Sequence, residues 1–195
     1  MAKASPVHGL SSQASLADNA HLIIRASLDD VYRWSSFVDQ PYAVHELHNL
    51  RIAAKRLRYT LELFLSVLSP QATAAIEALT RLQDILGELH DHDVMIALLR
   101  LCLGSQDSGS TYEYALLQTR KQSKKGDMTL PAGLVATLIN PTNTPNAQER
   151  YGLEHLLLSL QTQREQLYTD FRQHWYYLQL RDFRREILDI GERNP

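Results

Sequence analysis

Apolar residues recur every three to four positions along most of this chain, and this spacing limits the fold more than any other feature of the sequence. The pattern first appears between Leu16 and Phe37, where it predicts an amphipathic helix. No segment of the sequence alternates strictly between apolar and polar residues, as a half-buried strand would. We therefore expect an all-α protein, namely a helical bundle with long antiparallel helices.

Prolines divide the next part of the sequence into further helices. Residues 40–41 (Gln-Pro) and 69–70 (Ser-Pro) each have the form of a helix start, because proline at the first helical position loses no intrahelical hydrogen bond. They predict a second helix that runs to about Leu68 and a third amphipathic helix that Gly104 ends. Gly87 lies inside the third helix and is expected to bend it.

Composition separates one helical domain from less regular segments. Residues 1–14 are small and polar and predict a flexible tail, whereas a shift to Gly, Ser, Thr, Asn and Pro predicts an irregular insertion at about 104–145. Asn146, with Glu149 three residues later, has the form of a capping box and begins a last helix that runs to about residue 190. The expected organisation is a single helical domain over residues 15–190.

Composition also excludes several classes of protein. Hydrophobic residues at 44% and charged residues at 22% are close to the globular average, which argues against disorder. Cys102 is the single cysteine, so no intrachain disulfide is expected, and it has no metal-ligand spacing. The start of the sequence lacks the apolar stretch of a signal peptide, and the longest uncharged run, Met128 to Gln148, contains three prolines. We expect a cytoplasmic protein with no cofactor and no membrane partner.

Charge is segregated along the chain. The formal net charge is −2, which alone gives no reason to expect an anionic partner. Between residues 48 and 59 the sequence has no acidic residue and four basic ones: Arg51, Lys55, Arg56 and Arg58. That window carries +4, so the rest of the chain carries −6. The segregation favours an anionic partner for this window.

The basic window lies on the second expected helix, and its spacing aligns the side chains. One face of that helix is apolar and predicts the core face: Leu50, Ala54, Leu57, Leu61, Phe64 and Leu68. Another face carries polar and basic residues: His48, Arg51, Lys55, Arg58, Tyr59 and Glu62. Its cations spread over about 15 Å, and such a ladder suits an extended anion. The alternative is that these cations are simply solvated, or that they pair with acidic residues on neighbouring helices.

Two stretches resemble a known family. Residues 48–64, HNLRIAAKRLRYTLELF, resemble the signature helix of the CHAD family, the conserved-histidine α-helical domains, whose pattern is His-x-x-Arg-x-x-x-Lys/Arg-Arg-x-Arg followed by apolar residues. Residues 82–94, LQDILGELHDHDV, resemble the helix that follows it in the same family. Together the two stretches extend the resemblance over roughly Ala43 to Leu101.

The resemblance implies a helical bundle that binds inorganic polyphosphate through basic side chains, often in association with polyphosphate granules. It implies binding and not catalysis, so we expect no enzymatic activity, no catalytic residue and no metal site. Carried over position by position, the motif histidine falls on His48, and the basic positions fall on Arg51, Lys55, Arg56 and Arg58.

One departure from the family pattern bears on assembly. Family members commonly contain two repeats of a helical unit, each with its own basic helix, whereas this chain resembles one repeat. The later sequence HWYYLQLRDFRREI has His174, Arg181, Arg184 and Arg185, but not at the required spacing. A second copy of the chain would supply the other half of a basic surface, so we expect a homodimer.

Six further residues are candidates for a supporting role in anion binding: Tyr59, Gln83, His90, Lys124, Lys125 and Arg164. Tyr59 is an aromatic residue among cations. Lys124 and Lys125 belong to a basic cluster that is either a solvated segment or an extension of the electrostatic track. Arg164 falls on the apolar side of the last helix, where it pairs with an acid such as Asp93, reaches the rim or joins the anion-binding surface.

Gln83, His90 and Asp93 fall on the inward stripe of the third helix. We expect these polar groups to hydrogen-bond each other or to orient the arginines of the second helix. The alternative is a divalent metal held by the HDHD tetrad at residues 90–93 together with His48. Adjacent residues on a helix point in different directions, so the tetrad cannot converge on one ion without further ligands.

The residues therefore favour non-enzymatic binding of polyphosphate. A nucleic-acid-binding helical module is the main alternative, since it shares the electrostatic attraction, but the sequence shows no groove-entering element or stacking surface. A metal-dependent phosphohydrolase and a purely structural adaptor are the remaining alternatives.

Overall fold

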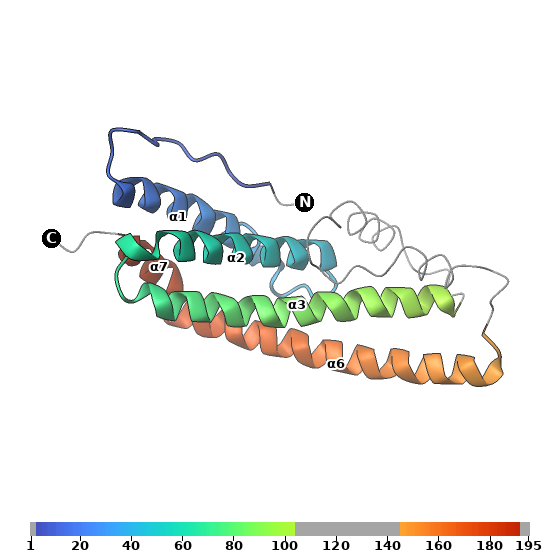
Figure 1. Cartoon of the computed structure of the whole chain (residues 1–195). Helices are drawn as coiled ribbons and strands as arrows, with labels where there is room; N and C mark the ends of the chain where they lie inside the picture. Colours follow the sequence, from blue (N-terminus) through green and yellow to red (C-terminus); the bar gives the residue numbers. More distant parts are fainter. Residues whose placement is uncertain (1–2, 104–144, 192–195) are drawn as a thin grey trace. The chain divides into compact units, whose positions relative to one another are not determined.

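The computed structural model describes residues 3–103 and 145–191, and most of these residues are helical (Figure 1). The α-helices are α1 (Leu16–Tyr32), α2 (Val44–Phe64), α3 (Ala72–Cys102), α6 (Ala147–Leu180) and α7 (Phe183–Gly191). Two short 3-10 helices, η1 (Ser35–Phe37) and η2 (Leu65–Val67), follow α1 and α2. The described ranges contain no strand. The prediction of an all-α helical bundle is confirmed.

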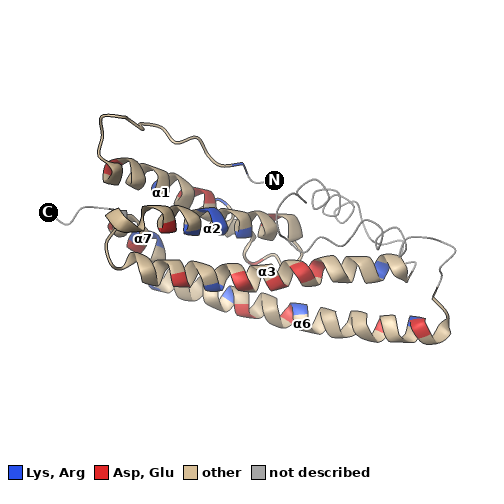
Figure 2. Ribbon diagram, viewed as in Figure 1, with Lys and Arg blue, Asp and Glu red and all other residues tan. Residues whose placement is uncertain are grey.

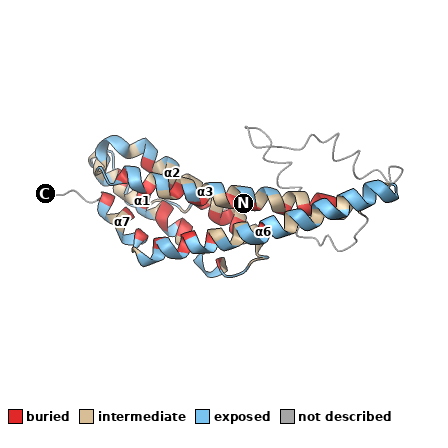
Figure 3. Ribbon diagram, turned by 90° about the horizontal axis from the view of Figure 1, so that it is seen from below, coloured by how far each residue is buried: buried red, intermediate tan, exposed pale blue. Residues whose placement is uncertain are grey.

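The chain divides into two compact units, and α3 and α6 each contribute to both. Unit 1 consists of residues 1–88 and 167–195, and unit 2 consists of residues 89–166. In unit 1, α1 packs against α2 and α7. The same unit holds most of the largest fully buried side chains: Ile24, Leu28, Leu50, Leu57, Leu61, Leu79, Leu82, Leu86, Phe171, Leu178 and Ile187. Buried and exposed positions alternate along the helices, as amphipathic helices require (Figure 3).

The predicted core face of α2 is confirmed for its first four residues. Four residues are fully buried, with a relative exposure of 0%: Leu50, Ala54, Leu57 and Leu61. The two remaining residues, Phe64 and Leu68, are only half-buried. The reason is that α2 ends at Phe64 and the 3-10 helix η2 follows it, so the helical register does not continue to Leu68 as predicted.

The first two helices have different limits from those predicted. Helix α1 begins at Leu16, with Ser15 and Asp18 forming a capping box, and ends at Tyr32 instead of Phe37. Helix α2 begins at Val44, so the start predicted at Pro41 is wrong. Pro41 lies in a turn instead, because the backbone N–H of Ala43 donates to the carbonyl of Gln40 at 3.1 Å and closes the chain before the helix begins.

Helix α3 begins close to the predicted start and runs without a break through Gly87, where we had expected a bend. The prediction of one continuous last helix is wrong. The Asn146 cap is confirmed, since its side-chain oxygen accepts from the N–H groups of Gln148 and Glu149 at 3.0 Å. However, α6 ends at Leu180 and α7 begins at Phe183, because Asp182 adopts a left-handed conformation with φ of 54° that interrupts the helix.

The segment before α1 has no helix, but it is hydrogen-bonded to α1 at Ser11, which bonds Asn19, and at Ser5. The backbone N–H of Ser5 donates to the Asp30 carboxylate at 3.0 Å, and the Ser5 hydroxyl donates to the same group at 2.6 Å. Asp30 lies on α1 and its side chain is only 5% exposed. Part of the segment predicted as a flexible tail is therefore hydrogen-bonded to a buried carboxylate.

Residues 104–144 lie outside the described residues, and with them the predicted irregular insertion and the candidates Lys124 and Lys125. None of the described helices has both the length and the apolar character needed to cross a membrane.

Candidate functional site

Four residues of α2 form one side of the helix, which we call the basic face: His48, Arg51, Lys55 and Arg58. They follow each other at intervals of three, four and three residues, so they align along α2. All four are half-buried, whereas Leu50, Ala54 and Leu57 turn into the core of unit 1. Figure 2 shows the basic residues of α2 as blue segments in the middle of the helix. The core thus fixes which side of α2 carries its cations.

Arg51 and Lys55 form no ion pair with the residues that the structure describes. They are four residues apart, so they lie about one helical turn, or roughly 6 Å, from each other along α2. Two adjacent cations that lack an acidic partner are the strongest feature of the basic face.

Arg58 is held differently from its two neighbours. Its Nη1 lies 2.8 Å from Oε1 of Glu62, one turn further along α2. Its guanidinium carbon lies 4.6 Å from the ring centroid of Tyr59, while Nζ of Lys55 lies 5.8 Å from the same centroid. Tyr59 is 49% exposed, so an aromatic ring does stand among the cations as expected. Glu62 falls on this side of the helix by its spacing, but its ion pair with Arg58 was not predicted.

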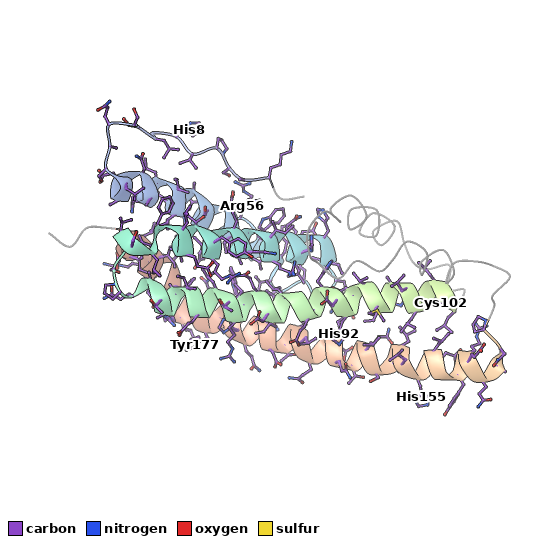
Figure 4. All side chains as sticks on the ribbon, viewed as in Figure 1. His8, Arg56, His92, Cys102, His155 and Tyr177 are labelled. Atoms are coloured by element: carbon purple, nitrogen blue, oxygen red, sulfur yellow. The ribbon has the colours of Figure 1, made fainter. Side chains whose placement is uncertain are left out.

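Arg56 does not belong to the basic face. It lies between α1 and α2 (Figure 4), and its Nη1 is 3.5 Å from Oδ2 of the buried Asp30. The same carboxylate accepts from Ser5 and lies 3.0 Å from Nη2 of Arg33. Of the five residues carried over from the family pattern, Arg56 is therefore the one whose charge is directed toward α1.

The inward polar residues of α3 have separate partners. In unit 1, Nε2 of Gln83 donates to the carbonyl of Leu79 on its own helix at 3.2 Å. His90 is half-buried on the part of α3 that belongs to unit 2. Also in unit 2, Nε2 of His92 lies 3.1 Å from Oε1 of Gln163. The described residues contain no group of three or more potential metal ligands, and the HDHD tetrad points in several directions.

Arg164 takes the first of its three expected roles. Its Nε lies 2.6 Å from Oδ1 of Asp93 in unit 2, with the two side chains only 7% and 4% exposed. Burial raises the pKa of the Asp93 carboxyl above its ordinary value, although the Arg164 guanidinium acts in the opposite direction. A buried pair of this kind fixes the contact between α3 and α6 within unit 2. This burial favours a structural role for Arg164.

The basic residues near the C-terminus are engaged in ion pairs. Nη2 of Arg181 lies 2.6 Å from Glu186, and Nη2 of Arg184 lies 2.7 Å from Asp29 on α1. Nε of Arg185 lies 3.9 Å from Asp189. His174 is buried and its ring nitrogen Nε2 donates to the carbonyl of Ala78 at 3.1 Å. These cations, which lack the family spacing, are thus paired with acids of the protein itself.

The fold and the basic face define the class of protein: an all-α bundle that presents a row of cations on one helix. A family model described as the CHAD domain matches residues 6–100, and this region of the chain belongs to the CHAD domain family. The match begins before α1 and ends within α3, so it includes α2 with its basic face. The CHAD domain is known in polyphosphate-related proteins. No curated protein and no solved structure matches the chain.

Proposed function

We propose that the protein binds inorganic polyphosphate on the basic face of α2 without catalysing a reaction. The observation that carries this proposal is the pair of cations Arg51 and Lys55, which have no acidic partner in the described part of the chain and lie one turn apart. Membership of residues 6–100 in the CHAD family supports the choice of ligand.

Each residue of the basic face contributes in its own way. The Arg51 guanidinium can hold two phosphate oxygens in a fork, while the Lys55 ammonium supplies a mobile point charge. Arg58 exchanges Glu62 for a phosphate, since a partly exposed intrahelical pair is weak enough for a strong anion to displace. His48 continues the row one turn before Arg51. Arg51, Lys55 and Arg58 only donate hydrogen bonds and attract charge, and we expect the polymer to leave the site unchanged.

Arg56 contributes at longer range. Its guanidinium is turned toward Asp30, so a phosphate on the basic face interacts with it through the electrostatic field and not by a direct fork. Binding takes place in the cytoplasm or on polyphosphate granules, and a homodimer would place two basic faces along one polymer.

The test is a titration of the full chain with polyphosphate of defined length. The variant Arg51→Ala/Lys55→Ala should lose at least about tenfold in affinity, because it removes two charge-assisted contacts. The matched control is Arg25→Ala/Arg185→Ala, which removes two exposed cations from α1 and α7 and should bind like the wild type. Equal losses in both variants would contradict a local site.

Two further measurements distinguish the alternatives. Duplex DNA and single-stranded RNA should compete for the basic face more weakly than polyphosphate at equal phosphate concentration, whereas stronger competition would favour the nucleic-acid module. Phosphate release from polyphosphate should stay at the level of the buffer with and without added divalent cations, and release that depends on the protein would favour a phosphohydrolase.

A further inference from the structure

A glycine stands inside α3 where no turn requires one. Gly87 is in the interior of a 31-residue helix that continues on both sides of it. Glycine weakens a helix interior compared with alanine, so a glycine in this position calls for a local reason. A Cβ atom at Gly87 would lie 3.6 Å from Nε of Arg51 and 3.9 Å from its Nη2. The guanidinium of Arg51 therefore rests against the bare backbone of α3 within unit 1.

We propose that Gly87 is a positioning residue that holds the Arg51 guanidinium ready for an anion. The inference rests on the proposed function, because it gives Arg51 the task of binding phosphate. Arg56 and Arg58 are held by the carboxylates of Asp30 and Glu62, which reduce their attraction for a second anion. Packing on Gly87 restrains Arg51 without an acidic partner among the described residues. Because Arg51 is already restrained, less conformational entropy is lost when the anion binds. Because the restraint comes from packing and not from a carboxylate, the charge of Arg51 is preserved.

The size of the side chain at position 87 is the critical quantity. A methyl group at 3.6 Å makes an ordinary van der Waals contact, so alanine fits beneath the guanidinium. We expect atoms beyond Cβ to compete with Arg51 for the same space. Leucine is the informative replacement because it forms helices well. Gly87→Leu therefore changes the space available to Arg51 more than it changes the helix propensity of α3.

Gly152 provides a matched control on α6. It also lies within a helix, but a Cβ atom there would have no neighbour within 4 Å. Gly152→Leu therefore adds the same bulk to a helical glycine that has open space around its Cβ position. Both leucine variants should keep the helical content and the cooperative unfolding of the wild type.

The first experiment follows the Arg51 side chain in the free protein by NMR. The Nε–Hε signal of Arg51 is assigned by its loss in Arg51→Lys. We expect Gly87→Ala and Gly152→Leu to leave its position and relaxation close to those of the wild type, whereas Gly87→Leu shifts the signal and increases its mobility. An unchanged signal in a folded Gly87→Leu variant would overturn the inference, and this result requires no ligand.

The second experiment is a double-mutant cycle of polyphosphate affinity. Gly87→Leu should weaken binding by roughly tenfold, about as much as Arg51→Ala, and should add nothing further in the Arg51→Ala background. Gly87→Ala should bind like the wild type. If Gly87→Leu weakens polyphosphate binding as much in the Arg51→Ala background as in the wild type, the inference is overturned. If the wild type does not bind polyphosphate, the proposed function fails, and the NMR experiment still decides whether Gly87 positions Arg51.

Discussion

The basic face of α2 and the arginines near the C-terminus are both rich in cations, yet they differ in how those cations are engaged. Arg181, Arg184 and Arg185 each have a carboxylate within ion-pair distance. Hydrogen bonding to Glu186 raises the pKa of Arg181 above its ordinary value. On α2, the structure gives Arg51 and Lys55 no such carboxylate in the parts of the chain that it describes. Local charge density in a sequence therefore does not measure the charge available to a ligand.

The two regions also differ in what their contacts support. Near the C-terminus, Arg184 connects α7 to α1 through Asp29, and Nε of Arg172 on α6 donates to Asp39 at 2.9 Å. Tyr176 and Arg172 together lower the pKa of the Asp39 carboxyl, because both donate hydrogen bonds to it. The Arg184 pair joins two helices, and the Arg172 pair joins α6 to the turn before α2. We infer that the C-terminal cations stabilise the bundle, whereas the basic face of α2 is the proposed ligand site.

A charge reversal on each region gives the largest contrast. Lys55→Glu should weaken polyphosphate binding by roughly 30-fold, because it removes one cation and repels the polymer beside Arg51. Arg185→Glu makes the same change in net charge on α7 and should alter affinity by less than about twofold. Isothermal titration calorimetry at fixed salt measures both values. Similar losses would mean that net charge, and not the basic face, governs binding.

The dependence on salt gives the next contrast. By analogy with nucleic acids, each cation that replaces a condensed counter-ion adds to the negative slope of log affinity against log salt concentration. Lys55→Met should make that slope shallower by about one, whereas Arg185→Met should leave it unchanged. Titrations at four or more salt concentrations measure the slopes. An affinity that does not respond to salt would contradict electrostatic binding on α2.

Removing an acidic partner sharpens the comparison in the opposite direction. Glu62→Gln releases Arg58 on the basic face, and we expect polyphosphate to bind about threefold more tightly, in line with the small energy of exposed ion pairs. Asp29→Asn releases Arg184 in the same way but should leave affinity unchanged, because Arg184 lies outside the basic face. An equal gain in both variants would show that any released cation suffices.

The smallest effect on binding is expected at His174. Burial lowers the pKa of His174 below 6.5, so as pH falls the unfolded chain takes up a proton before the folded chain does. The free energy of unfolding should therefore fall as pH decreases from about 6.5 toward the lower pKa of the folded state. His174→Gln can still donate to the carbonyl of Ala78 and should reduce this pH dependence while leaving polyphosphate affinity unchanged. Thermal unfolding between about pH 7.5 and pH 5.5 measures the difference. An identical pH dependence in both proteins would contradict the assignment.

Local sequence signals were sufficient for much of the fold. Periodicity identified the helical class and the core face of α2 at Leu50, Ala54, Leu57 and Leu61, and the capping residue Asn146 marked the start of α6. The motif on α2 indicated the CHAD family, which the family comparison confirms over residues 6–100. These features depend on residues within a few turns of each other, so a one-dimensional pattern contains them.

Other features depend on which helices meet. Sequence alone named Asp93 as one of several partners for Arg164, and it contained no local sign that Asp30 would face Arg56 or that Gly87 would lie beneath Arg51. The left-handed Asp182 that separates α6 from α7 was likewise not predicted. Aspartate is a weak helix former and one of the few residues besides glycine that visit the left-handed conformation, so packing can select it there. The sequence by itself determined the helical class, most of the core face of α2 and the row of cations on α2. Only the tertiary structure decided which of those cations meet a carboxylate, because an ion pair requires two side chains from distant parts of the chain within a few ångströms.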